Sequence, residues 1–322
     1  MNKYVCITIG DIKGIGYEIL LNSYNNNEVR NFILFSNFKI IKKKLKVKKN
    51  KINIINQHSN KYIVKPDHFN IFNYDAKNNF ENSYLSMKNA YFFCKKNNLK
   101  GIITLPINKN KIIKNIDDKF VGQTEFYQKL DKKNNSNMIF KYKNYIFTTI
   151  TTHLKISELN KKIKEKKLIN NKLLTLNNTL KLDFGIKKPN LIISGFNPHA
   201  GENNNLGNEE RKIFLPQIKK LKNEKVLIDG PFSADSMINK KNLKKYDCFI
   251  FSFHDQALIP YKLLSKNRGV NYTSNLSIIR VSPDHGTAYD IVGKNIAINK
   301  SFLNCFKLID FITKNRKKFD KF

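Results

Sequence analysis

The sequence of 322 residues is short of several residue types: it has no Trp, 4 Cys and only 25 Asp plus Glu against 59 Lys plus Arg. It also lacks any run of about 18 apolar residues, which excludes a membrane-spanning helix. The first residues enter a strand-like pattern without the apolar core and small-residue cleavage site of a secretory signal. No cysteine lies in a C-x-x-C pair, so we expect reduced, mostly buried thiols in a cytoplasmic protein: Cys6, Cys94, Cys248 and Cys305.

Arginine is also scarce, and this changes the interpretation of the net charge of +34. Proteins that recognise nucleic acids rely on the planar guanidinium fork, yet almost every basic residue here is Lys. Lys, Asn, Ile, Phe and Tyr, whose codons are rich in A and T, are over-used together, so compositional drift explains the charge. No specific nucleic-acid partner is expected. The arginines are Arg30, Arg211, Arg268, Arg280 and Arg316.

The hydrophobic content of 41%, with 24 Phe and 14 Tyr, is sufficient for a large folded core. Apolar, β-branched runs predict strands at 3–9, 31–36, 101–105, 145–151, 190–195, 225–229, 248–253 and 276–281. Helical spacing predicts helices at 16–24, 83–97, 155–180 and 303–318. This alternation predicts an α/β protein with a largely parallel sheet.

Polar residues follow these strands repeatedly. Ligands of parallel sheets bind at the carboxyl ends of the strands, so this repetition predicts an active site there. The segments are Gly10-Asp11, Pro106 to Lys109, His153, Asn197 to His199, His254-Asp255 and Asp284-His285.

Histidine is scarce, with 6 in the chain, and His153, His199, His254 and His285 occupy these strand ends. A single histidine in such a place is usually structural. Several at equivalent strand ends suit a divalent metal with imidazole ligands and open positions for a substrate. Both interpretations stay open from spacing alone.

Two further segments have a structural and a functional interpretation. Glu209 and Glu210 open a helix, where carboxylates favour the helix dipole, after a loop that would direct His199 into a cleft. Lys262, Asn271 and Arg280 follow His254, and an arginine retained in a Lys-rich chain suggests phosphate or carboxylate binding rather than a surface ion pair. The glycines after the first strand do not match the dinucleotide fingerprint.

Several short motifs occur in a specific order along nearly the whole chain. They include Ile7-Thr8-Ile9-Gly10-Asp11, Thr104-Leu105-Pro106-Ile107-Asn108-Lys109, Gly122-Gln123-Thr124-Glu125, Asn197-Pro198-His199-Ala200-Gly201-Glu202, His254-Asp255-Gln256 and Asp284-His285-Gly286-Thr287-Ala288. Together they resemble the 4-hydroxythreonine-4-phosphate dehydrogenase family of vitamin B6 biosynthesis.

The resemblance implies NAD-dependent oxidation and decarboxylation of 4-phosphohydroxy-L-threonine to 3-amino-2-oxopropyl phosphate, with a divalent metal (zinc, magnesium or cobalt). It implies two α/β/α subdomains around a cleft, similar to isocitrate and isopropylmalate dehydrogenases. Their approximate bounds are 1–125 with 275–322 for the first and 126–274 for the second. It also implies a homodimer with the site near the interface, to which both chains can contribute metal ligands.

The resemblance further assigns roles to individual residues. The implied metal ligands are His153, His199 and His254. The implied substrate contacts are Gln123, Thr124, Lys262, Asn271 and Arg280. Lys109, Asp255 and His285 are alternatives for proton relay or cofactor contact.

Two departures from the family pattern leave alternatives open. The family usually has Gly-His-Thr-Glu where this chain has Gly122-Gln123-Thr124-Glu125. A neutral Gln is expected to donate to phosphate without charge, which weakens binding by about 1 kcal/mol. The Asn203-Asn204-Asn205 run also replaces a Gly-rich loop. Gln123 leaves open a paralogue that oxidises a related phosphorylated four-carbon acid. The net charge separately raises the alternative of a basic nucleic-acid-binding protein, against which the scarcity of Arg and the intact histidine set argue.

Overall fold

The computed structural model describes residues 3–59, 61–165 and 167–319, and the chain divides into two compact units. Unit 1 comprises Met1–Asp131 with Leu276–Thr313, and unit 2 comprises Lys132–Asn275 with Lys314–Phe322. Both units combine strands with helices, so the predicted α/β class is confirmed. None of the helices in the described ranges is long and apolar enough to cross a bilayer.

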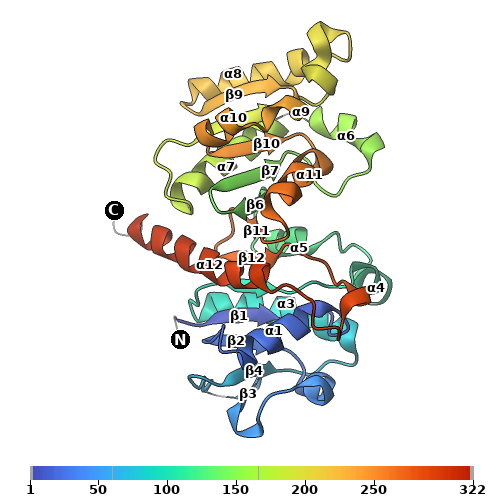
Figure 1. Ribbon diagram of the computed structural model, residues 1–322, viewed down its shortest axis with the longest axis vertical. Coiled ribbons are helices and arrows are strands. Elements are labelled where there is room, and N and C mark those ends of the chain that lie inside the picture. Colours follow the sequence, from blue (N-terminus) through green and yellow to red (C-terminus); the bar gives the residue numbers. More distant parts are fainter. Residues whose placement is uncertain (1–2, 60, 166, 320–322) are drawn as a thin grey trace. The chain divides into compact units, whose positions relative to one another are not determined.

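Unit 1 is built on parallel strands in the order β3–β4–β2–β1–β5–β12 (Figure 1). The strands are β1 (Val5–Thr8), β2 (Phe32–Phe35), β3 (Ile52–Asn56), β4 (Phe69–Asn73), β5 (Ile102–Thr104) and β12 (Arg280–Pro283). The helices are α1 (Ile15–Asn25), α2 (Phe38–Ile41), α3 (Asn79–Lys96), α4 (Lys109–Asn115), α5 (Gln123–Leu130) and most of α12 (Lys300–Phe319). Because β1 lies between β2 and β5, the loops after β1 and β5 meet at a topological switch point, where open α/β sheets bind ligands.

The core of unit 1 follows from continuous apolar strands. Every residue of β1 and β2 is buried, as expected for parallel strands that are covered on both faces. Helix α3 packs on β1, β2 and β5 through a face that includes Met87 and Tyr91. Its N-terminus is capped by Asn78, whose side chain accepts from the backbone amides of Phe80 and Glu81.

Unit 2 contains the strand order β11–β6–β7–β10–β8–β9. β7, β10, β8 and β9 are parallel, whereas β6 runs antiparallel to both β7 and β11. The strands are β6 (Met138–Tyr142), β7 (Tyr145–Thr149), β8 (Asn190–Ser194), β9 (Leu227–Phe232), β10 (Cys248–Phe251) and β11 (Val270–Thr273). The helices are α6 (Ile156–Ile163), α7 (Leu168–Leu182), α8 (Leu215–Asn223), α9 (Ala234–Met237), α10 (Lys240–Lys245) and α11 (His254–Ser265).

Aromatic side chains form much of the unit 2 core. The Phe147 ring stacks on Phe249 with a centroid separation of 5.2 Å, and it also contacts Phe251 and Tyr261. Tyr261 places α11 against β7 and β10, because its hydroxyl also donates to the Lys141 carbonyl at 3.1 Å. These contacts hold the second half of α11 against the sheet of unit 2.

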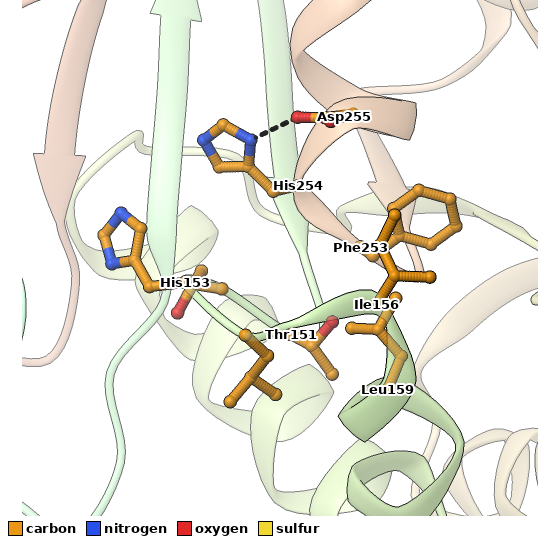
Figure 2. Close-up of a pocket in the computed structure, with 9 residues that line it drawn as sticks. Thr151, His153, Ile156, Leu159, Phe253, His254 and Asp255 are labelled. Carbon is orange, nitrogen blue, oxygen red and sulfur yellow. Dashed lines mark hydrogen bonds and ion pairs between the residues drawn. The ribbon is translucent and has the colours of Figure 1, made fainter.

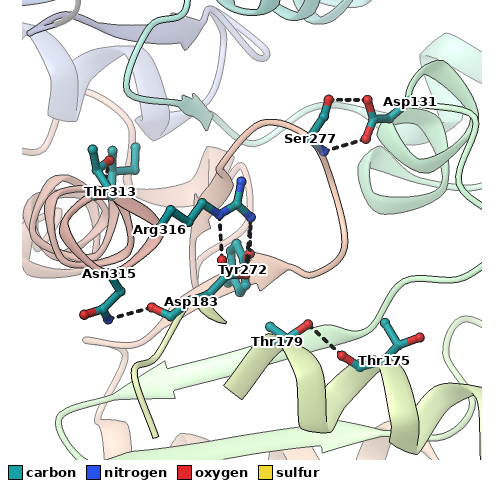
Figure 3. A network of polar contacts seen from close by, with 10 residues as sticks. Asp131, Thr175, Thr179, Asp183, Tyr272, Ser277, Thr313, Asn315 and Arg316 are labelled. Carbon is teal, nitrogen blue, oxygen red and sulfur yellow. Dashed lines mark hydrogen bonds and ion pairs between the residues drawn. The ribbon is translucent and has the colours of Figure 1, made fainter. Parts of the chain in front are cut away.

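Each unit also contains a buried carboxylate with several donors (Figure 3). In unit 1, Asp131 accepts from the Ser277 amide at 2.6 Å, from the Tyr91 hydroxyl at 2.7 Å and from Lys95 Nζ at 3.3 Å. Burial alone would raise the pKa of this carboxyl, but hydrogen bonds from the side chain and backbone of Ser277, then from Tyr91 and Lys95, outweigh it and lower the pKa.

In unit 2 the corresponding carboxylate is Asp183. Arg316, in the last turn of α12, donates to both of its oxygens, at 2.6 and 3.2 Å. The Tyr272 hydroxyl also donates to Asp183, and Arg316 Nη2 contacts that hydroxyl at 3.2 Å. The end of α12 is thus fixed by an ion pair between the half-buried Arg316 and the buried Asp183 (Figure 3).

The structure corrects two predicted elements. The strand expected at 276–281 is β12, which begins only at Arg280. The single helix expected at 155–180 is two helices, because Lys167 adopts a left-handed conformation (φ 68°) ahead of α7. The expected burial of the thiols is confirmed, since Cys6, Cys94, Cys248 and Cys305 are all free and buried.

Candidate functional site

Arg280 is the most deeply buried charged side chain of the predicted site. It is 1% exposed at the start of β12, adjacent to β5. Its Nε and Nη2 donate to Thr104 Oγ1 at 3.0 and 2.6 Å, and Nη1 contacts Thr124 Oγ1 at 3.4 Å. The guanidinium also lies 5.7 Å from the centre of the Tyr127 ring. Burial lowers the pKa of Arg280 to about 10, so the group is still protonated at neutral pH.

Gln123 connects Arg280 to the end of β5. Its Oε1 accepts from Arg280 Nη2, and its Nε2 donates to the Leu105 carbonyl at 3.0 Å. The orientation of this amide is chemically determined, because guanidinium only donates and a carbonyl only accepts. The structure therefore gathers Gln123, Thr124 and Arg280 into one cluster, in which Gln123 contacts the arginine.

The loops after β1, β5 and β12 meet beside this cluster within unit 1. Asp11, which is buried, accepts from Asn79 Nδ2 and from the Tyr289 hydroxyl, both at 2.7 Å. The first amide of α1 donates to the Thr287 carbonyl at 2.9 Å. A Cβ at Gly14 would lie 2.7 Å from that carbonyl oxygen, which explains the glycine by close approach of the two loops.

Two of the predicted metal ligands come together in unit 2, and the topology explains why. β7 and β10 are parallel neighbours, so the loops that follow them emerge side by side. His153 follows β7 and His254 begins α11 after β10, and their ring centroids are 6.0 Å apart (Figure 2). The Thr151 hydroxyl links the two loops by donating to the Ser252 carbonyl at 2.8 Å.

The tautomer of the neutral His254 ring follows from its neighbour. Asp255 Oδ1 lies 2.7 Å from His254 Nδ1, and an ionised carboxylate only accepts, so Nδ1 carries the proton (Figure 2). This leaves the Nε2 lone pair available, which is the arrangement of metal-binding histidines whose other nitrogen is held by a carboxylate. Both imidazoles border a cavity of about 170 Å³ whose other wall includes Ile156, Leu159 and Phe253.

These two histidines fit a divalent metal as part of a ligand set. Two imidazoles on a tetrahedral zinc have centroids about 5 Å apart, given Zn–N bonds of about 2.0–2.1 Å, so 6.0 Å is close to that spacing. Within residues 3–59, 61–165 and 167–319, no three His, Cys, Asp or Glu side chains of this chain gather at one point. His199 is thus not grouped with the pair, and the three-histidine set remains a prediction.

His199 lies in a loop with an unusual backbone. The loop follows β8, the neighbour of β10, so it emerges at the same sheet edge as the other two histidines. From His199 to Asn203 every residue is left-handed, with φ between 40° and 84°. Left-handed backbone costs about 1–2 kcal/mol for each residue other than glycine, and Gly201 is the one glycine in this run. His153 is also left-handed, at φ 42°.

The remaining predicted residues lie on α11, on β11, on α4 and in the loop after β12. Lys262 is half-buried in α11, and Asn271 on β11 has a buried side-chain oxygen with no hydrogen-bond partner. Lys109 is exposed at the start of α4. His285 Nδ1 lies 3.1 Å from the Gly286 carbonyl oxygen. Their roles remain predictions.

Several residues of the site were not singled out from the sequence. Thr104 and Tyr127 contact Arg280, and Glu210 contacts the loop of His199. One feature of the sequence could have identified Thr104 as a site residue, because it is the polar last residue of a buried strand. Glu210 was interpreted through the helix dipole, whereas its carboxylate turns back to Phe196 and Asn197.

Similarity to solved structures defines the class of protein first. A crystal structure of 4-hydroxythreonine-4-phosphate dehydrogenase from Klebsiella pneumoniae has a TM-score of 0.81 at 24% identity, over 97% of this chain and 99% of that one. A beta-decarboxylating dehydrogenase from Thermococcus kodakarensis has a TM-score of 0.50 at 10% identity, over 96% and 83% of the two chains. The chain therefore has the α/β fold of these dehydrogenases.

Sequence similarity then identifies the family. The chain is 34% identical to the 4-hydroxythreonine-4-phosphate dehydrogenase of a Sulfurihydrogenibium species, over 97% of this chain and 99% of the relative. The sequence pattern of the family described as pyridoxal phosphate biosynthetic protein PdxA matches residues 28–309. The chain belongs to the PdxA family.

Proposed function

We propose that this chain is a 4-hydroxythreonine-4-phosphate dehydrogenase that uses NAD and a divalent metal to oxidise and decarboxylate 4-phosphohydroxy-L-threonine. The observation that carries the proposal is the buried Arg280 cluster beside the switch point of unit 1. A protonated guanidinium held in a fixed orientation suits a phosphate, because its donors match the phosphate oxygens in pairs. Family membership supports the same substrate class.

The cluster would bind the phosphate end of the substrate through groups whose positions are already fixed. Thr104 holds one edge of the guanidinium, and Gln123 holds Nη2 from the other side. We therefore assign Gln123 to orienting Arg280, and we assign Thr124 and Arg280 to contact with the phosphate. Lys262 and Asn271 are proposed as further substrate contacts.

The histidine pair would hold the divalent metal. A bound metal supplies Lewis-acid chemistry, which polarises a substrate hydroxyl and favours its loss of a proton. His254 would bind through Nε2 while Asp255 fixes its ring, and His153 would bind beside it. We propose His199 as the third ligand. Asp255 is thereby assigned to orienting His254, and Lys109 and His285 are the candidates that carry the proton.

We also propose that the protein is a homodimer and that a second chain completes the ligand set. Helix α11 starts with His254 and exposes Ile259 by 65% and Leu263 by 74%, one turn apart on the same face. Large apolar side chains exposed together on one helix face favour burial against another protein surface. Asp255, which contacts His254 Nδ1, lies one turn before Ile259 on this face, so a second copy seated on it would lie next to Asp255.

The proposal is tested by NADH formation with 4-phosphohydroxy-L-threonine, followed by absorbance. We expect activity that EDTA abolishes and that zinc, magnesium or cobalt restores. His254→Ala should reduce turnover by about a thousandfold or more, because it removes a metal ligand. His58→Ala replaces an exposed histidine outside the site and should leave the rate unchanged.

Two outcomes would change the assignment. The dehydrogenase proposal fails if no divalent ion supports NADH formation. A higher kcat/KM with phosphothreonate or phosphoerythronate would instead identify a paralogue with a different phosphorylated acid as its substrate. Sedimentation of wild-type protein and of the Leu263→Lys variant tests the dimer, which the added charge should dissociate.

A further inference from the structure

The loop that presents His199 adopts a conformation that its own sequence does not favour. Residues His199 to Asn204 all have positive φ, although Ala200 and Glu202 have no side-chain means of stabilising a left-handed backbone. Residues 202–206 are exposed, so little packing holds this part of the loop. The left-handed conformation therefore has to be stabilised by a residue outside the turn.

The Glu210 carboxylate is the group that meets the start of this loop. It is 5% exposed at the beginning of a π-helical turn, Glu210–Phe214, that precedes α8. Its Oε1 accepts from the backbone amides of Phe196 and Asn197, at 2.8 and 2.7 Å. Its Oε2 accepts from Asn197 Nδ2 at 2.9 Å. One buried side chain thus binds three donors from the two residues that precede Pro198.

Glu209 supports the same contact from the next position. Its Oε2 accepts from Asn197 Nδ2 at 2.8 Å, so the Asn197 amide lies between two carboxylates. This hydrogen bond is the largest cause of the lowered pKa of Glu209. Both carboxylates therefore contact the entry of the loop, and Glu209 Oε1 also accepts from Asn160 Nδ2 at 3.2 Å and lies 4.0 Å from Lys164 Nζ.

The far side of the turn is shaped around the same carboxylate. A Cβ at Gly201 would lie 2.8 Å from Glu210 Oε2 and 2.9 Å from the Gly207 carbonyl oxygen, so a side chain at this position would displace Glu210. Glu210 therefore binds the two residues before Pro198 and also lies beside Gly201, in the middle of the left-handed run.

We propose that Glu210 is a positioning residue that clamps the left-handed turn and so sets the direction of His199. The carboxylate acts through hydrogen-bond geometry, because both backbone amides need an acceptor at the position of Oε1. The clamp itself does not depend on the proposed function. Only its consequence for metal binding rests on the assignment of His199 as a ligand.

Two conservative variants separate geometry from charge. Glu210→Gln keeps the side-chain length and an acceptor at Oε1 but loses the charge. Glu210→Asp keeps the charge but withdraws the carboxylate by one methylene, out of reach of both amides. Glu224→Asp makes the same shortening at an exposed glutamate at the end of α8 and serves as the control.

The first readout is amide hydrogen exchange at Phe196 and Asn197 in EDTA-treated protein. We expect exchange at least about tenfold faster in Glu210→Asp, because both amides lose their acceptor. Glu210→Gln should stay within about threefold of wild type, and Glu224→Asp should match wild type. A purely electrostatic role predicts the opposite order, with Glu210→Gln the more affected variant, and that order would overturn the proposal.

The second readout is zinc affinity, measured by competition with a chromophoric chelator, together with kcat and KM. Glu210→Asp should bind zinc at least about tenfold more weakly and lose about a hundredfold in kcat, with little change in substrate KM, since misplacement by about 1 Å has effects of this size. If wild type neither binds zinc nor forms NADH, the proposed function fails. Hydrogen exchange alone then tests whether Glu210 holds the left-handed turn. If Glu210→Asp does not fold, tenfold faster exchange in Glu210→Gln refutes the proposal and exchange within threefold supports it.

Discussion

Replacing Arg280 by Lys separates the shape of the guanidinium from its charge. Arg280 Nε and Nη2 share Thr104 Oγ1, and Nη2 also donates to Gln123 Oε1. The Thr104 hydroxyl lies 3.4 Å from the Val281 carbonyl, to which it donates, so both of its lone pairs are available to the guanidinium. A lysine ammonium is a single point charge and cannot reach these acceptors together.

The size of the effect follows from the hydrogen bonds that a lysine at this position cannot make. A hydrogen bond to a charged group contributes about 1.5–3 kcal/mol, and at least two such bonds are removed while the charge remains. We expect a total of about 3–5 kcal/mol, divided between folding and substrate binding. If about 3 kcal/mol appears in binding, the KM for the phosphorylated substrate rises about a hundredfold.

The assay combines steady-state kinetics with urea unfolding. The KM for NAD should change by less than about threefold, because the effect is confined to the phosphate end. Arg211→Lys makes the same exchange at an exposed arginine. It should change neither the KM for the phosphorylated substrate nor the urea midpoint. A wild-type KM and urea midpoint in Arg280→Lys would refute the argument that geometry, and not charge alone, makes Arg280 effective.

Three further perturbations test the environments of buried charges. Gln123→Glu places a carboxylate against Arg280, so the KM for the phosphorylated substrate should rise about tenfold, whereas an unchanged KM would contradict the assigned contact. The lowered pKa of Asp131 means that its stabilisation is present above about pH 4 and is lost as the pH falls through the lowered value. Urea unfolding across this range should therefore show a steeper acid loss for wild type than for Asp131→Asn. Arg316→Met leaves the Asp183 carboxylate buried without its cation, and the unfolding free energy should fall by about 3–5 kcal/mol, measured in urea at pH 7.

The fold was predicted best where burial is continuous. The run at 3–9 contains β1, because fully apolar parallel strands have a clear pattern. β3 was missed because its sequence Ile-Asn-Ile-Ile-Asn contains Asn, a residue that strands usually avoid. Pairing with β4 along its whole length overrides that preference. The strands β4 and β6, which lie inside the strand orders of units 1 and 2, were not predicted either, so a position at the sheet edge does not account for the missed strands.

For the candidate site, the sequence predicts which strand ends carry the residues but not the contacts that these residues make. The strand ends identified the regions of Arg280 and of the histidines, since parallel neighbours place their loops together. The contact of Thr104 with Arg280 spans 176 positions in the sequence, and no local pattern predicts it. The direction of the Glu210 side chain depends on the π-helical turn that carries it, which a helix-dipole argument cannot anticipate.

The burial of all the thiols has a practical consequence for measuring how the protein moves. Burial raises the pKa of Cys6, Cys248 and Cys305, so alkylating reagents react with them only when the surrounding structure opens. Cys248 lies in unit 2, whereas Cys6, Cys94 and Cys305 lie in unit 1. Mass spectrometry of timed alkylation therefore gives a separate opening rate for each unit from the native sequence. The same experiment with substrate or metal added would show which unit opens more slowly when each ligand is bound.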